Sequence, residues 1–243
     1  MRAGEAQLPI SQDAVTDRQI KRRVIALYQD LRVPRLYTML KMAILPLSEC
    51  VAHLPVEGRI LDVGCGYGYL ANYLSLQSPR RQVVGYDVAS DRVQIAQQTI
   101  GSRRNVEFLV VNSPDRLSGM FDSIVMTEVL HHMPYEQQGP LLASVFAKLK
   151  PGGSFVMREG DKGFSLRYAL FNYFSEWVLY CGKEKLKFRS AEEWARMLTT
   201  TGYELLRRIP SSPLFPYLTV TFICAKPLMP AADRQLPQHR QRA

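Results

Sequence analysis

Short apolar runs alternate with helical stretches between residues 58 and 160. The runs FLVV and SIVMT carry no polar alternation, which is typical of parallel strands buried on both faces. Helices expected over 67–77, 90–100 and 135–149 would cover those faces. With right-handed crossovers, this order predicts an α/β, doubly wound fold. Its five strands are expected over 59–63, 82–87, 106–111, 121–127 and 154–158.

Individual residues mark where the helices begin and end. Ser90 is expected to cap the helix that follows it, and Lys150-Pro-Gly-Gly is expected to end the helix before it. Ser190 and Glu193 form a capping box that would open a later helix. Strands expected over 203–209 and 218–225 are joined by a link too short for a crossover helix, so they should be antiparallel to each other.

Residues 14–54 have a different pattern, of helices broken near Pro34 and Pro46. Their apolar residues recur at helical spacing: Ile20, Val24, Leu27 and Leu31, then Leu36, Met39, Leu40 and Ala43. We therefore expect an N-terminal helical lid over 1–54 and a main domain over 55–228. An aromatic-rich stretch suggests a helical cap insertion over about 162–190, and a proline-rich flexible tail would follow over 229–243.

The first expected strand ends in Asp62-Val63-Gly64-Cys65-Gly66-Tyr67-Gly68 and turns directly into a helix. Glycines let the backbone approach a ligand closely, and a helix N-terminus offers unpaired amide groups. Asp87 ends the next strand, where a carboxylate can accept hydrogen bonds from ribose hydroxyls. Dinucleotide enzymes share this plan with GxGxxG spacing, so the GxGxG here leaves two kinds of nucleoside site open.

Four segments resolve that choice by resemblance. LDVGCGYGYL, GYDVA, FDSIVMTEVLHHMP and LKPGGSFVMRE resemble, in order and separation, four motifs of class I S-adenosylmethionine-dependent methyltransferases. The resemblance spans about residues 58–160 and is closest to the group that methylates small molecules. It implies a Rossmann-like, seven-stranded sheet closed by a C-terminal antiparallel strand pair, with S-adenosyl-L-methionine as cofactor.

The resemblance also implies which residues hold the cofactor. The residues expected beneath its methionine portion are Gly64, Cys65, Gly66 and Gly68, and those bordering the methionine end are Thr127 and Glu128. Asp62 would fix the loop and face the cofactor's amino group through water. The nucleoside would lie against Asp87, Val88, Asn112 and Ser113.

Two of these assignments have structural alternatives, and one departs from the family pattern. Ser113 can be a turn residue before Pro114, and Thr127 can simply end a strand. The family often has Asp where Asn112 stands, but the Asn side-chain oxygen can still accept a hydrogen bond from the adenine amine.

Methyl transfer needs an aligned nucleophile and a dry site, and a general base helps when the acceptor carries a proton. The leaving group is neutral, so we expect no metal. Candidate catalytic residues are His131, His132 and Glu159, with Asp161 a lesser candidate. The alternative is that one histidine only shapes the turn before Pro134. Tyr168, Phe171, Phe174 and Trp177 would line a substrate pocket or, equally, pack as core.

Composition limits the partners. Four scattered cysteines argue against a zinc site and a disulfide framework, and no apolar run or signal-like N-terminus is present, so we expect a cytoplasmic protein. The net charge of +9 suits a nucleic acid, a membrane surface or an acyl carrier, but no basic stripe is interleaved with aromatics. We therefore predict a methyltransferase of an apolar or aromatic small molecule, free or linked to lipid or carrier. The alternatives are an RNA methyltransferase and a non-catalytic partner protein with the same fold.

Overall fold

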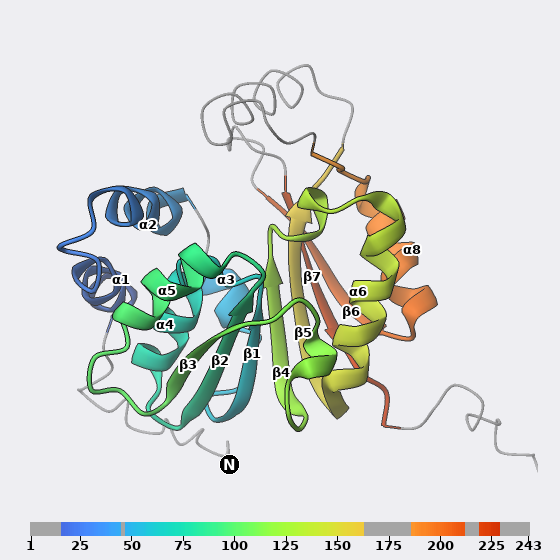
Figure 1. Ribbon diagram of the computed structural model, residues 1–243. Coiled ribbons are helices and arrows are strands. Elements are labelled where there is room, and N and C mark those ends of the chain that lie inside the picture. Colours follow the sequence, from blue (N-terminus) through green and yellow to red (C-terminus); the bar gives the residue numbers. More distant parts are fainter. Residues whose placement is uncertain (1–15, 45–46, 163–185, 212–218, 229–243) are drawn as a thin grey trace, which may run out of the picture.

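The computed structural model describes residues 16–44, 47–162, 186–211 and 219–228. Within them, strands form one seven-stranded sheet in the order β3-β2-β1-β4-β5-β7-β6 (Figure 1). Strands β1 to β5 are parallel, and β7 lies antiparallel between β5 and β6, which confirms the predicted doubly wound sheet and closing pair. The strands are β1 Gly58–Val63, β2 Arg81–Asp87, β3 Val106–Val110, β4 Phe121–Thr127, β5 Leu149–Gly160, β6 Glu204–Pro210 and β7 Thr219–Ala225.

Helices cover both faces of this sheet, as its apolar strands require. They are α1 Asp17–Ala26, α2 Arg32–Ile44, α3 Leu47–Val51, α4 Tyr69–Gln77, α5 Ser90–Gln98, α6 Tyr135–Lys148 and α8 Ala191–Thr201, with short 3₁₀ turns η1 Pro114–Arg116 and η2 Leu130–His132. None of the helices in the described ranges is long and apolar enough to cross a membrane.

Each strand of the sheet contributes to two hydrophobic cores. Ile60 of β1 faces a core shared with α1 and α4, whereas the next residue, Leu61, faces a core shared with α6 and α8. Alternate side chains of a strand point to opposite faces, so both become buried when helices cover both sides. Ile20 and Val24 of α1 belong to the first core, which anchors the N-terminal helices to the sheet domain.

The structure corrects one local prediction and confirms two. Ser90 is the first residue of α5 rather than its cap; Ala89 holds the cap position and makes no side-chain bond. Helix α6 ends at Lys148, just before Lys150-Pro-Gly-Gly as expected, but the strand expected from residue 154 begins earlier, because β5 starts at Leu149 and pairs with β4 there before a register shift. The capping box at Ser190 is confirmed: its hydroxyl accepts a hydrogen bond from the amide of Glu193 at 3.2 Å.

The second N-terminal helix also differs from the expectation. It begins at Arg32, so Pro34 lies in its first turn, where a residue without an amide hydrogen loses no helical hydrogen bond. The break between α1 and α2 therefore comes before Pro34. Its buried positions are Pro34, Thr38 and Met42. The apolar residues whose spacing predicts this helix, Leu36, Met39, Leu40 and Ala43, are exposed.

Candidate active site

The glycine loop connects β1 to α4 and takes a conformation that other residues rarely adopt. Gly64, Gly66 and Gly68 have φ angles of 68°, 52° and 81°. A side-chain carbon at Gly64 would lie 2.6 Å from Cγ2 of Val129, and one at Gly68 would lie 2.6 Å from the ring of Phe108. At Gly66 the same carbon would meet nothing within 4 Å. Two glycines thus allow close packing, and the third faces open space.

Asp87 ties this loop to the end of β2. Its Oδ2 accepts a hydrogen bond from the amide of Gly66 at 2.8 Å, and its Oδ1 accepts one from the amide of Ala89 at 2.9 Å. A carboxylate oxygen has two lone pairs, so each can accept a further hydrogen bond from a ligand. Asp87 therefore shapes the loop and still presents acceptors beside it.

Asp62 lies beneath the loop and is fully buried. Its Oδ2 accepts a hydrogen bond from the amide of Ala71, in the first turn of α4, at 3.1 Å. Burial raises the pKa of Asp62 to about 8, and the negative charge of nearby Asp87 adds to that rise. Asp62 thus fixes the helix to the strand from below.

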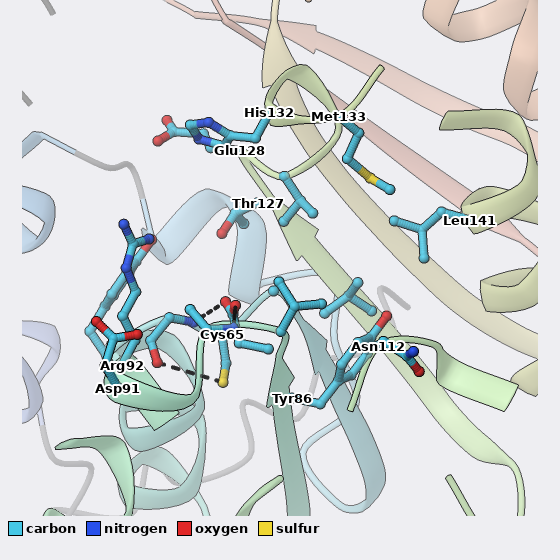
Figure 2. Close-up of a pocket in the computed structure, with 18 of the residues that line it drawn as sticks. Cys65, Tyr86, Asp91, Arg92, Asn112, Thr127, Glu128, His132, Met133 and Leu141 are labelled. Carbon is cyan, nitrogen blue, oxygen red and sulfur yellow. Dashed lines mark hydrogen bonds between the residues drawn. The ribbon is translucent and has the colours of Figure 1, made fainter. Parts of the chain in front are cut away.

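A pocket of about 450 Å³ opens at the carboxyl ends of the parallel strands (Figure 2). Ligand sites of doubly wound folds occur at this edge. Eight of the residues predicted to hold the cofactor line it: Gly64, Cys65, Gly66, Asp87, Val88, Asn112, Thr127 and Glu128. They come from four strand ends, so the fold brings together residues that lie far apart in the chain.

Three predicted cofactor residues do not line this pocket. Asp62 is buried below the loop, and Gly68 packs against Phe108 and Ala96. Ser113 begins the η1 turn: its hydroxyl accepts a hydrogen bond from the amide of Asp115 at 3.2 Å, as expected for the turn-residue alternative.

A charged cluster at the pocket was not foreseen from the sequence. The carboxylate of Glu128 pairs with Lys41 from α2 and with Arg158 from β5. Burial alone would raise the pKa of Glu128, but the two cations hold it well below its usual range. Among the residues that the structure describes, Glu128 is the one non-glycine residue with positive φ, at 57°. Such strain is typical of functional sites.

Aromatic side chains close the α2 side of the pocket. Tyr37 of α2 packs edge-on against Tyr67, with ring centroids 5.2 Å apart, and against Tyr69 at 6.3 Å. Tyr37 and Tyr69 line the pocket together with Arg92, whose guanidinium lies 5.8 Å from the ring of Tyr67. Helix α2 therefore contributes directly to the pocket wall.

The three candidate catalytic residues occupy different environments. His132 lines the pocket near Glu128 (Figure 2). Glu159 and His131 are buried and do not line it, and Nδ1 of His131 lies 2.6 Å from Oε2 of Glu159. The other oxygen of Glu159 accepts hydrogen bonds from the amides of Val129 and Leu130, at 2.8 and 2.6 Å.

Glu159 thus holds the loop that carries His132. The carboxylate of Asp161 accepts a hydrogen bond from the amide of Ala191 at 2.9 Å, which places it at the start of α8. The predicted substrate residues Tyr168, Phe171, Phe174 and Trp177 lie outside the described residues, as does most of the expected cap.

Comparison with known proteins identifies the class to which this fold and pocket belong. A family model described as a methyltransferase domain matches residues 37–208. The chain belongs to this family, which confirms its resemblance to class I S-adenosylmethionine-dependent methyltransferases and the cofactor that the resemblance implies.

Two curated methyltransferases are similar to more than half of this chain. A ubiquinone biosynthesis O-methyltransferase from Chromobacterium violaceum is 31% identical over 151 residues, which are 60% of this chain and 61% of the relative. A demethylmenaquinone methyltransferase from Deinococcus radiodurans is 28% identical over 178 residues, 64% of this chain and 71% of the relative. The chain spans only 26%, 61% and 43% of the first three curated relatives it matches.

Solved structures share the fold at low identity. A methyltransferase-like protein from Bacillus halodurans aligns over 75% of this chain and 99% of its own, with a TM-score of 0.60 and 16% identity. Magnesium protoporphyrin IX methyltransferase from Synechocystis, solved with bound SAH, aligns over 92% and 90% with a TM-score of 0.57 and 16% identity.

The pocket fits S-adenosylmethionine by its own geometry. Open space above Gly66 lets a ligand lie against the loop backbone, and a cavity of about 450 Å³ is within the usual size range for small-molecule sites. Asp87 offers acceptors for hydroxyl groups, whereas Val88, an exposed apolar residue, offers a surface for a flat base.

Proposed function

We propose that this protein transfers a methyl group from S-adenosylmethionine to an oxygen, carbon or nitrogen of an apolar or aromatic small molecule, free or linked to a lipid or an acyl carrier. The observation that carries the proposal is that the glycine loop, Asp87 and His132 all line one pocket. A donor site and a group able to move a proton thus share one cavity.

The cofactor would be held from two sides. Gly64, Cys65 and Gly66 would contact its methionine portion, and Asp87 would bind the ribose hydroxyls. The adenine would lie between Val88 and Asn112, whose amide can accept from the adenine amine. Bound S-adenosylmethionine supplies a methyl group activated by its positively charged sulfur.

The remaining chemistry belongs to the chain. We assign His132 to proton removal from the acceptor, because it lines the pocket and a histidine titrates near neutrality. Glu159 and His131 would act as positioning residues, because their polar atoms hold the loop below His132. The aromatic wall formed by Tyr37 and Tyr69 would exclude water from the reacting atoms.

The acceptor class rests on the pocket wall and on the relatives. The pocket wall also presents Met133, Leu141 and Val129, which suit an apolar ring or chain. The relatives named above act, by their names, in ubiquinone biosynthesis and on demethylmenaquinone. An acceptor with a quinone-like or other aromatic ring agrees with both observations.

Two measurements test the proposal. Titration calorimetry should give saturable binding of S-adenosylmethionine, and no binding would contradict an enzymatic role. Purified protein, labelled methyl donor and whole-cell extract should then yield label in the lipid or small-molecule fraction. Label in the RNA fraction would instead support the RNA methyltransferase alternative, which the net charge of +9 favours. The Asp87→Ala variant provides the background.

A further inference from the structure

Helix α2 carries an unusual concentration of exposed apolar side chains. Val33, Leu36, Met39 and Leu40 are 72%, 59%, 44% and 47% exposed. Val33, Leu36 and Leu40 follow helical spacing and so lie on one side, opposite the buried residues Pro34, Thr38 and Met42. Exposed apolar residues are ordinary when single, but four within one short helix form a patch, and patches of this kind mark interaction sites.

Positive charge surrounds this patch, which we call the α2 face and define as Val33, Leu36, Met39 and Leu40. Arg32 lies one turn before Leu36, and Arg35 lies one turn before Met39, and both are exposed. The neighbouring helix α1 adds three further exposed arginines, at positions 18, 22 and 23.

Acidic residues on the same two helices do little to offset this charge. Asp17 is engaged by Lys21 at 3.0 Å and by the hydroxyl of Tyr73 at 2.6 Å. Asp30, between the helices, is exposed. Five exposed arginines on α1 and α2 thus outnumber Asp17 and Asp30, and this basic charge complements an anionic partner.

A flank of the same helix, between the α2 face and its buried side, lines the pocket. Tyr37 lies one turn after Val33, Lys41 lies one turn after Tyr37, and both form part of the pocket wall. The pocket wall therefore adjoins the α2 face. In Figure 1, α2 lies at the outer edge of the molecule, at the end of the sheet where the parallel strands terminate. A surface that binds the α2 face would thus lie beside the pocket.

We propose that the α2 face docks on an anionic lipid bilayer, with its four apolar side chains at the boundary between headgroups and acyl chains. An amphipathic helix with apolar residues on one face and flanking basic residues binds membranes in this way. The chemistry favours lipid over nucleic acid, because phosphate contacts need the arginines but offer nothing to Leu36 and Leu40. An acceptor dissolved in the bilayer would then reach the pocket beside α2, which extends the proposed function.

Vesicle sedimentation tests the apolar half of the proposal. The chain should bind vesicles of phosphatidylglycerol and phosphatidylcholine, and Leu36→Gln/Leu40→Gln should reduce the partition coefficient at least about tenfold. The matched control is Leu206→Gln/Leu228→Gln, which changes two leucines that are 59% and 79% exposed on other elements. The control should stay within about twofold of the unaltered protein. Equal loss in both variants would overturn the assignment of the surface.

A second pair of variants tests the contribution of the arginines to vesicle binding. Arg32→Gln/Arg35→Gln should weaken binding to these anionic vesicles, and the loss should shrink as salt rises. Arg104→Gln/Arg207→Gln removes two exposed arginines elsewhere and should have little effect. Transfer RNA serves as the competing ligand: if it binds more tightly than vesicles and the leucine variant binds it unchanged, the surface is a nucleic-acid site and the proposal is wrong.

Two further readouts keep the result unambiguous. The melting temperature of Leu36→Gln/Leu40→Gln should match that of the unaltered protein; a marked drop would show that the chain itself covers the α2 face, which contradicts the proposal. Binding of S-adenosylmethionine should be unchanged in this variant. Loss of vesicle binding with intact cofactor binding supports the membrane surface, and failure of cofactor binding in the unaltered protein would contradict only the proposed function.

Discussion

Asp87 is the residue on which cofactor binding should depend most. Its carboxylate orients Gly66 and, in the proposed site, would offer acceptors to the ribose. We expect Asp87→Ala to weaken S-adenosylmethionine binding by about 1.5–3 kcal/mol, the usual value for hydrogen bonds to a charged group. Calorimetry measures this loss, and Asp30→Ala removes an exposed acid from another surface as a control. Unchanged affinity in Asp87→Ala would remove this residue from the site.

His132 and Glu159 should respond differently to mutation, because one faces the pocket and the other is buried. His132→Ala should lower label transfer about 10²-fold or more with little change in stability. Glu159→Ala leaves two amides and His131 without their acceptor and should lower the free energy of unfolding by at least about 2 kcal/mol.

Denaturant unfolding and label transfer, measured on both variants, separate the two roles. Rescue of label transfer in His132→Ala by added imidazole would support proton transfer at that position. A stable but inactive Glu159→Ala protein would show that Glu159 is more than a positioning residue.

The buried carboxyl group of Asp62 should make the stability of the folded protein depend on pH. Its pKa is raised from 3.8 to about 8 in the folded protein, so the folded state keeps a proton that the unfolded chain releases over this range. Its contribution to stability is therefore present at low pH and is lost as pH rises toward 8. Asp62→Asn keeps an acceptor for Ala71 and should flatten this loss. Urea unfolding across the range measures it, and an equal slope in both proteins would contradict the prediction.

The sequence shows some of these residues more clearly than others. Gly66 lies within the glycine motif and Asp87 lies at the end of the next expected strand, so spacing alone identified both as ligand-binding candidates. Lys41 could not be found in this way, because it lies 87 residues from Glu128 and meets it only through the fold. Arg158 did carry a signal that was missed: a charged residue inside a buried strand needs a partner.

At the scale of elements, the ion pair between Lys41 and Glu128 helps to hold α2 at the pocket, together with the ring contacts of Tyr37. Lys41→Met would leave Glu128 paired with Arg158 alone and should lower the free energy of unfolding by about 1–3 kcal/mol. Hydrogen exchange should speed up at the amides of α2 and stay unchanged in α6, which lies in the other core. Lys21→Met is the control, since it removes a lysine from the surface of α1. Uniform acceleration would indicate global rather than local opening.

The elements also show what a sequence pattern can and cannot predict. The strand expected over 121–127 matches β4, because an unbroken apolar run has few alternatives. Helical spacing predicted a helix around Leu36, Met39 and Leu40 but not that these side chains are exposed, because periodicity finds an apolar stripe and does not say which partner covers it. The strand expected over 154–158 is longer in the structure, because β5 begins at Leu149, where it pairs with Phe121 of β4 far away in the chain.

For the whole molecule, ligand binding and folding are linked. A ligand at 100 times its dissociation constant stabilises the folded state by about 2.7 kcal/mol. S-adenosylmethionine should therefore raise the melting temperature by several degrees, and the dinucleotide NADH, whose enzymes share the glycine-loop plan, should not. Differential scanning fluorimetry with both ligands makes the comparison. A larger shift with NADH would reverse the choice between the two nucleoside sites.

The contact between Gly64 and Val129 has a consequence for the spacing of the two reactants. Gly64 belongs to the donor loop, whereas Val129 lies in the loop that Glu159 holds below His132. Because a side-chain carbon at Gly64 would come within 2.6 Å of Val129, the two loops pack too closely for any side chain at Gly64. In the proposed reaction, this contact would fix the distance between the methyl donor and the acceptor. A carbon added at Gly64 should push the two loops apart and lengthen the distance that the methyl group must cross, even if both ligands still bound.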